Sequence, residues 1–141
     1  MSDRPPFHLA FPVDDLEAAR GFYGGVLGCP EGRSSETWVD FDLHGHQIVA
    51  HLDSSMDGKA RTNEVDGDAV PIFHFGLVLD FQLFDDMASR LRAADAPFIL
   101  EPRTRFEGQP GEQRTMFVRD PAGNGLEFKA FADASRIFAR D

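Results

Sequence analysis

Two histidines interrupt matching apolar stretches of this sequence. His8 lies in PFHLAFPV and His74 lies in IFHFGLVL, and both stretches otherwise have the composition of buried strands. A glutamate, Glu127, interrupts the apolar stretch LEFKAF in the same way. Imidazole and carboxylate groups bind divalent metals and also serve as general acids and bases. The residue types therefore indicate metal binding or proton transfer, provided that the fold brings these side chains together.

The two histidine stretches belong to an internal repeat. FHLAFPVD aligns with FHFGLVLD at an offset of 66 residues, so that the histidines and the closing aspartates match. A helical pattern of apolar residues follows each copy, with Asp14 as the expected N-cap of the first helix and Glu17 three residues on. Strand patterns come next, namely ETWVDFDL and QIVAHL in the first copy and PFILEP, RTMFVR and LEFKAF in the second.

This pattern predicts an α+β fold of two βαβββ modules that form a curved mixed sheet around a central trough. We expect one domain over residues 1–141, with module 1 at about 6–53, a polar exposed linker at about 54–70, module 2 at about 71–131 and a C-terminal tail at 132–141. The Gly- and Pro-containing stretch RTRFEGQPGEQR in module 2 is long enough to form a lid or a rim over a site.

Strand periodicity predicts which face carries the polar side chains. Residues two apart share a face of a strand, so the histidine rows lie opposite the bulky rows that would pack on the helices. On the last strand of module 1, His51 shares a face with Gln47 and Val49, and on the last strand of module 2 Glu127 shares a face with Lys129. Four potential ligands thus occupy the first and last strands of the modules on the concave face, namely His8, His51, His74 and Glu127.

Charge and composition exclude several classes of function. The chain carries a formal charge of -10 and is 42% hydrophobic, so an acidic surface would repel nucleic acids and anionic membranes. The densest cationic stretches, EPRTRF and EQRT, are short and mixed with acidic residues, although an arginine there is available to an anionic substrate. Cys29 is the only cysteine, and no signal peptide or apolar run of membrane-spanning length is visible. We expect a soluble protein in the reducing cytoplasm.

The motifs resemble those of the vicinal oxygen chelate superfamily, which contains glyoxalases, extradiol dioxygenases, methylmalonyl-CoA epimerases and fosfomycin-modifying or bleomycin-binding proteins. The resemblance rests on FHLAFPVDD, FYGGVLG, FHFGLVL and FVRDPAGNGLEF and covers roughly residues 6–131. Its most specific part is the turn before the strand glutamate, formed here by Asp120, Pro121 and Gly123 ahead of Glu127. The whole pattern is most similar to small extradiol-dioxygenase-like members.

The resemblance implies that His8, His74 and Glu127 bind a divalent metal in the central trough. The family's fourth inward position, a glutamate in glyoxalases and a glutamine in epimerases, falls on His51 when IVAHLD is matched to the corresponding strand. Counted instead from the turn at Gly45, this position is Val49, and Gln47 is a weaker candidate.

These alternatives leave two roles open for His51. It is either a fourth metal ligand or a catalytic acid or base, since an imidazole titrates near neutral pH.

The implied activity is that of an Fe(II) extradiol-type dioxygenase acting on a small catecholic or other vicinal-oxygen compound. Two histidines and one carboxylate leave adjacent metal positions open, as ferrous oxygenases require. Phe117 departs from the family, because many extradiol enzymes carry a tyrosine at this position. The alternatives are a glyoxalase-type lyase or epimerase that uses Zn, Mn, Ni or Co, and a metal-free small-molecule binding or resistance protein. The resemblance also implies a homodimer.

Overall fold

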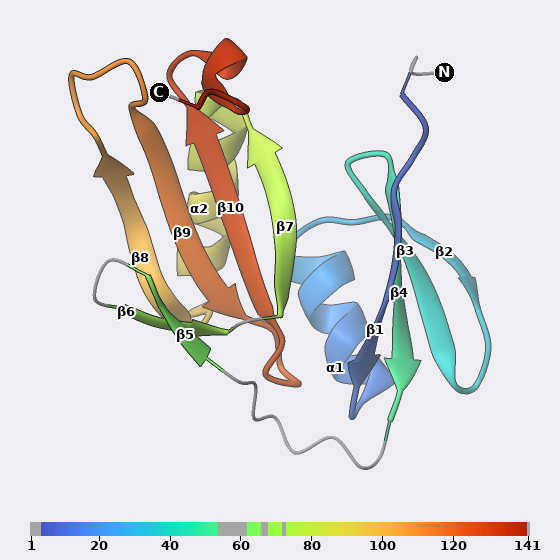
Figure 1. The fold of residues 1–141 in the computed structure, drawn as a ribbon. Helices are drawn as coiled ribbons and strands as arrows, with labels where there is room; N and C mark the ends of the chain where they lie inside the picture. Colours follow the sequence, from blue (N-terminus) through green and yellow to red (C-terminus); the bar gives the residue numbers. More distant parts are fainter. Residues whose placement is uncertain (1–3, 54–61, 66–67, 72, 141) are drawn as a thin grey trace. The chain divides into compact units, whose positions relative to one another are not determined.

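The computed structural model describes residues 4–53, 62–65, 68–71 and 73–140, and the chain divides into two compact units. Unit 1 is Met1–Lys59 and unit 2 is Ala60–Asp141. Each unit contains one βαβββ repeat with a four-stranded mixed sheet (Figure 1). The α+β fold class and the modular repeat predicted from the sequence are confirmed.

Unit 1 builds its sheet in the order β1-β4-β3-β2, with β1 parallel to β4 and the remaining pairs antiparallel. The first strand therefore pairs with the last strand of the module. Its elements are β1 (His8–Val13), α1 (Leu16–Ala19), a π-helical segment (Arg20–Val26), β2 (Glu31–Ser34), β3 (Trp38–Leu43) and β4 (His46–Leu52).

Unit 2 repeats this topology in the order β7-β10-β9-β8, again with the first strand parallel to the last. One face of this sheet is covered by α2, which lies behind the strands in Figure 1. Its elements are β7 (His74–Leu79), α2 (Phe81–Ala93), β8 (Phe98–Arg105), β9 (Gln113–Arg119), β10 (Gly125–Phe131) and a 3₁₀ turn (Ala134–Arg136).

A short hairpin precedes β7 in the segment that the sequence predicted to be a linker. Strand β5 (Thr62–Val65) pairs antiparallel with β6 (Asp68–Pro71). Alternation in this segment is too short, and its residues are too polar, to be distinguished from a loop by pattern. The other linker residues, 54–61 and 66–67, lie outside the described residues.

Burial alternates along the first strands as the sequence predicted. In β1, Phe11 and Val13 are buried whereas His8 is exposed, and in β7 Leu79 is buried whereas His74 and Val78 are exposed. The bulky row of each strand thus contributes to the core of its unit. The histidine row lies on the opposite face of the sheet, where it is available for chemistry.

The core of unit 1 is organised around Tyr23, which is fully buried. Its ring lies 5.1 Å from that of Phe11, 5.0 Å from that of Phe22 and 5.4 Å from that of Phe41, between centroids. Tyr23 comes from the π-helical segment, where the backbone N–H of Leu27 donates to the carbonyl of Phe22 five residues earlier. Tyr23 is therefore a packing residue of the unit 1 core.

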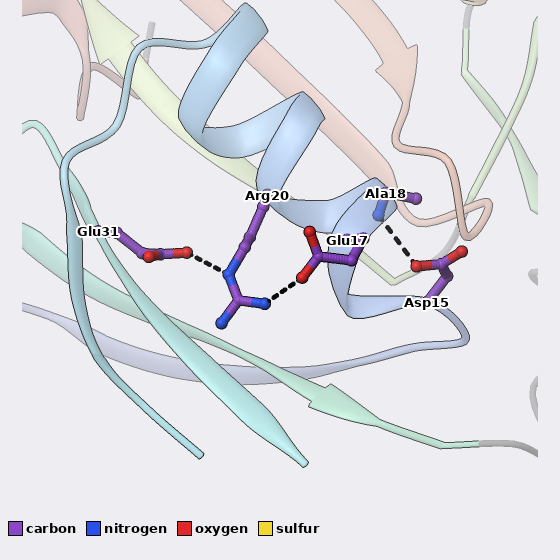
Figure 2. A network of polar contacts seen from close by, with 5 residues as sticks. All are labelled: Asp15, Glu17, Ala18, Arg20 and Glu31. Atoms are coloured by element: carbon purple, nitrogen blue, oxygen red, sulfur yellow. Dashed lines mark hydrogen bonds and ion pairs between the residues drawn. The ribbon is translucent and has the colours of Figure 1, made fainter. Parts of the chain in front are cut away.

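An exposed ion-pair network joins the helix of unit 1 to β2. Arg20 donates from Nε to Glu31 and from Nη1 to Glu17, each at 2.5 Å (Figure 2). These hydrogen bonds, the one to Glu31 first, raise the pKa of the Arg20 guanidinium, which is charged in any case. Because exposed ion pairs are screened by water, the network adds little stability.

The first helix is capped by Asp15 and not by Asp14, which corrects the sequence prediction by one residue. The Asp15 side chain accepts from the backbone N–H of Ala18 at 3.0 Å (Figure 2). We expect Asp15→Ala to lower the free energy of unfolding by about 1 kcal/mol, because this N–H loses its partner. Urea unfolding measures the change, with Asp14→Ala as the adjacent control. An equal loss in both variants would contradict the assignment.

Helix α2 in unit 2 also begins at an aspartate that caps its N-terminus. Asp80 caps it by accepting from the N–H of Leu83 at 2.8 Å, and Phe84, Met87 and Leu91 form its buried stripe against the sheet. Among the described residues, no helix is long and apolar enough to cross a membrane.

Candidate metal centre

His8 is held by Gln47, which is itself held by Asp40 on the next strand of unit 1. It lies directly opposite Gln47 in the parallel β1–β4 pair, and its Nδ1 lies 2.7 Å from Gln47 Oε1. Gln47 Nε2 in turn donates to Asp40 Oδ2 at 3.1 Å. Because the Asp40 carboxylate only accepts, the amide must point its nitrogen at Asp40 and its oxygen at His8. The His8 ring therefore donates through Nδ1, which leaves Nε2 with a lone pair.

His74 in unit 2 has the same tautomer as His8, fixed by a different contact. Its Nδ1 lies 2.7 Å from the backbone carbonyl oxygen of Pro71. A carbonyl oxygen only accepts, so Nδ1 carries the proton and Nε2 has the lone pair. Histidines that bind metals in proteins typically donate their second nitrogen to a carboxylate, amide or backbone oxygen in this manner. Both repeated histidines thus have the tautomer that suits metal binding through Nε2.

The ring of His74 is also held by packing. The buried Phe117 ring meets it edge to face, with 4.8 Å between centroids. Phe117 lies opposite Glu127 in the β9–β10 pair, and the family resemblance implies a tyrosine at this position in many extradiol enzymes. In this chain the position orients an imidazole and supplies no proton donor.

Glu127 lies between three polar groups on β10 and its neighbours. Thr115 Oγ1 donates to Oε2 at 3.0 Å, while Lys129 Nζ lies 3.6 Å and His74 Nε2 lies 3.8 Å from Oε1. The Glu127 side chain is 17% exposed and that of His74 is 31% exposed. A cavity of about 190 Å³ opens beside them. The carboxylate is therefore fixed at one oxygen and accessible at the other.

The turn before β10 sets the position of this glutamate. Asp120 is buried, and its Oδ1 accepts from the backbone N–H groups of Ala122 and Asn124 at 3.0 and 2.8 Å. Gly123 adopts a φ of 96°, a conformation that favours glycine. This closed turn starts β10 at Gly125, level with His74 on β7. The turn motif that carried the family resemblance thus acts by fixing the register of Glu127.

The separation of His74 and Glu127 can be compared with that of two ligands of one ion. Ligand atoms bound at about 2.1 Å lie about 3.4 Å apart at a tetrahedral angle and about 3.0 Å apart at the right angle of an octahedral ion. The observed distance between Nε2 and Oε1 is 3.8 Å, which is longer than both values and too long for a hydrogen bond. The pair therefore has donor types that suit a metal, and the two atoms would approach each other on sharing one.

A close backbone approach fixes the same pair of strands. Gly76 lies opposite Glu127, and a Cβ atom at Gly76 would overlap the Glu127 carbonyl oxygen. At Gly125, a Cβ atom would lie 2.7 Å from the ring of Pro71, the residue that holds His74. Glycine is thus required where the two ligand strands meet.

His51 lies far from His8 along the sheet. It pairs with Pro12 on β1 and with Trp38 on β3, four residues along β4 from Gln47, a separation of about 13 Å at strand spacing. Val49, the other position considered, pairs with Ala10 and is buried. The residue level with His8 is Gln47, which the sequence ranked lower. The first residue of β1 pairs with the second residue of β4, so the available signal was a polar residue near the start of β4.

The proposed ligands are divided between the units, with His8 in unit 1 and His74 and Glu127 in unit 2. Across the described residues, no group of three or more His, Cys, Asp or Glu side chains gathers into a metal cluster. Each unit by itself contains one histidine whose Nδ1 hydrogen-bonds to an oxygen atom, namely His8 in unit 1 and His74 in unit 2. In unit 2 the Glu127 carboxylate lies beside this histidine.

Repeated βαβββ modules with a first-strand histidine and a last-strand glutamate define a class of protein. The sequence profile of the glyoxalase/bleomycin resistance protein/dioxygenase superfamily matches residues 6–128. The chain belongs to this superfamily. No match is found among functionally curated proteins.

Solved structures agree with this assignment. A glyoxalase/bleomycin resistance protein/dioxygenase from Alicyclobacillus acidocaldarius is 32% identical, with a TM-score of 0.79 over 96% of this chain and 97% of that chain. A lactoylglutathione lyase from Agrobacterium tumefaciens is 25% identical, with a TM-score of 0.64 over 90% and 96% of the two chains. A fosfomycin resistance protein from Listeria monocytogenes, 19% identical with a TM-score of 0.69 over 92% and 94%, shares the fold.

Proposed function

We propose that the chain is a metal-dependent oxidoreductase, an Fe(II) extradiol-type dioxygenase acting on a small catecholic or other vicinal-oxygen substrate. His8, His74 and Glu127 would supply the ligands. The observation that supports this most is that both histidines donate through Nδ1 to an oxygen atom and keep Nε2 available. Two imidazoles and one carboxylate form the ligand set of non-haem ferrous oxygenases.

The three-ligand set is favoured over four because Gln47 is already engaged. Its oxygen accepts from His8 and its nitrogen donates to Asp40, so the amide positions the imidazole. His8, His74 and Glu127 would hold a ferrous ion, which would supply the means to bind a vicinal-oxygen substrate together with dioxygen. Because the register separates His51 from His8, we propose no ligand role for His51. Its role as an acid or base stays a prediction.

One observation favours a second candidate. Gln47 lies level with His8, and it was the weaker candidate for the inward position at which the family resemblance implies a glutamate in glyoxalases and a glutamine in epimerases. A relative at 25% identity is a lactoylglutathione lyase. Rotation of the Gln47 amide toward a bound ion would give four ligands, the arrangement suited to polarising a carbonyl with Zn, Mn, Ni or Co.

We also propose a homodimer as the assembled form, as the family resemblance implies.

Elemental analysis tests the two candidates. We expect tag-free protein to contain about one iron per chain and, after anaerobic ferrous loading, to consume oxygen with at least one member of a catechol panel. Gln47→Ala is expected to keep the iron stoichiometry and to weaken metal affinity by about 10- to 100-fold, since it removes the support of His8.

Two other outcomes of the metal analysis would contradict the dioxygenase proposal. Bound zinc, nickel or manganese without oxygen uptake would replace the dioxygenase with the lyase or epimerase. Protein that binds none of these metals, even after loading, would contradict both candidates and favour a small-molecule binding protein.

A further inference from the structure

A buried hydroxyl group is in contact with Glu127, one of the proposed metal ligands. Thr115 on β9 is 3% exposed, and its Oγ1 lies 3.0 Å from Glu127 Oε2. Because a carboxylate only accepts hydrogen bonds, the hydroxyl is the donor in this contact. A buried hydroxyl without a partner is unfavourable, so Thr115 and Oε2 hold each other in place. One oxygen of the carboxylate is therefore occupied before any metal binds.

The other carboxylate oxygen, Oε1, lies beside the imidazole of His74. Lys129 Nζ lies 3.6 Å from Oε1 and His74 Nε2 lies 3.8 Å from it, and both distances are too long for hydrogen bonds. The Lys129 side chain is 36% exposed, so its ion pair with Glu127 is screened by water and can be exchanged for a bound ion. The two oxygens of Glu127 therefore differ, because Thr115 holds Oε2 and Oε1 is accessible.

Strand pairing places Thr115 diagonally across from Glu127. Phe117 lies directly opposite Glu127 in the antiparallel β9–β10 pair, and Thr115 lies opposite Lys129. Diagonal neighbours on one face of a sheet are close enough for a long side chain to reach across. Thr115 and Phe117 share a face of β9, and Phe117 packs against His74. Strand β9 therefore contacts both proposed ligands of unit 2 although it supplies neither.

Unit 1 contains the same diagonal arrangement. Asp42 on β3 lies directly opposite Gln47, and the residue two positions earlier, Asp40, accepts a hydrogen bond from the Gln47 side chain. In unit 2, Thr115 likewise comes two positions before the residue that lies opposite Glu127. In each unit the third strand in the sheet order thus holds a polar side chain of the last strand of the module. The repeat indicates that each module positions its polar groups through this strand.

We propose that Thr115 is a positioning residue, which holds Glu127 so that the carboxylate binds the metal through Oε1 alone. This inference rests on the proposed function, because it assigns a role at the same metal centre. A carboxylate that is free at both oxygens can bind one ion through both. By holding Oε2, Thr115 keeps a further metal position available to a substrate oxygen.

Cobalt binding to the full-length protein tests the role of Thr115 at the metal centre. Thr115→Val keeps the shape of the side chain and removes the hydroxyl. We expect the affinity for Co²⁺ to fall by about 10- to 100-fold, as for other groups that support a metal ligand. The visible absorption spectrum of the Co²⁺-saturated protein should also change, since Oε2 is released. Thr115→Ser keeps the hydroxyl and is expected to restore most of the affinity and the original spectrum.

Thr104→Val is the matched control for Thr115→Val. Thr104 lies on β8 in the same sheet, and its side chain is exposed. The substitution is expected to leave the Co²⁺ affinity and the spectrum unchanged. Unchanged affinity and spectrum in Thr115→Val, or a loss in Thr115→Ser as large as that in Thr115→Val, would overturn the positioning role.

A thermodynamic cycle tests the contact in metal-free protein. Thr115→Val removes the donor, Glu127→Met removes the acceptor, and urea unfolding compares both single variants with the double variant. Because the acceptor is charged, we expect the unfolding equilibrium constant of the double variant to depart from the product of the single effects by at least about 5-fold. Thr104→Val combined with Glu127→Met is expected to show no such departure.

The metal centre and the role of Thr115 fail separately. Coupling between Thr115 and Glu127 in a protein that binds neither Co²⁺ nor Fe²⁺ would refute the metal centre and support Thr115 as the residue that positions Glu127. Independent effects of Thr115→Val and Glu127→Met on unfolding would overturn the role of Thr115, even in a protein that binds metal.

Discussion

His74→Ala is expected to abolish stoichiometric metal binding while unit 2 stays folded. Removal of the imidazole loses its contact with the Phe117 ring but leaves the helix-packed core on the other face of the sheet intact, and it removes one of the two proposed nitrogen ligands. We expect metal affinity to fall by more than about 100-fold, beyond the usual effect of losing a supporting hydrogen bond. Metal content per chain after dialysis, together with the circular dichroism spectrum, measures both parts of the prediction.

The control is another exposed histidine. His44 lies in the β3–β4 turn with a φ of 51°, and His44→Asn keeps a residue that tolerates this conformation. It should bind metal as the unaltered protein does. Full metal occupancy in His74→Ala, or equal loss in His44→Asn, would remove His74 from the ligand set.

Gly76→Ala should have the largest effect on stability. The added methyl group overlaps the Glu127 carbonyl oxygen, and this atom belongs to the paired backbone and cannot move alone. We expect the free energy of unfolding to fall by more than about 3 kcal/mol, at or above the upper end for overpacked sites. The misplacement of Glu127 should also weaken metal binding in whatever fraction of the protein stays folded.

Gly111→Ala provides the comparison for Gly76→Ala. Gly111 lies in the β8–β9 turn, and a Cβ atom there meets nothing within 4 Å. Its substitution should change stability by less than about 1 kcal/mol, in the stabilising direction, because alanine restricts the unfolded chain. Thermal and urea unfolding compare the two variants. Similar midpoints would show that β7 and β10 can separate at Gly76 without cost.

The repeat and the faces of its strands were predictable because they depend on local pattern alone. The alternation of His8 with Phe11 and Val13 repeats in β7, and period-2 burial follows directly from strand geometry. The glutamate on β10 was predictable for the same reason. Pattern was sufficient wherever one face of a strand is apolar.

The register of β4 against β1 was not predictable. Sliding a strand by two residues leaves the same side chains on the same face, so the alternation of apolar and polar residues does not change. His51 and Gln47 share a face of β4, so alternation alone could not show which one is level with His8. The N-cap shifted by one residue for a similar reason, since Asp14 and Asp15 are chemically equivalent and only backbone geometry separates them. Contacts such as that of His74 with the Pro71 carbonyl depend on tertiary structure and leave no sequence signal.

The parallel pairing of first and last strands has a consequence for folding kinetics. His8 and its support Gln47 are 39 residues apart, and His74 meets β10 only after the whole of module 2 has been made. These are the long-range contacts that slow folding, since the intervening chain must be ordered before they form. Nascent or partly folded chains therefore lack the contacts of His8 with Gln47 and of His74 with Glu127, so metal uptake at the proposed centre would report a late stage of folding.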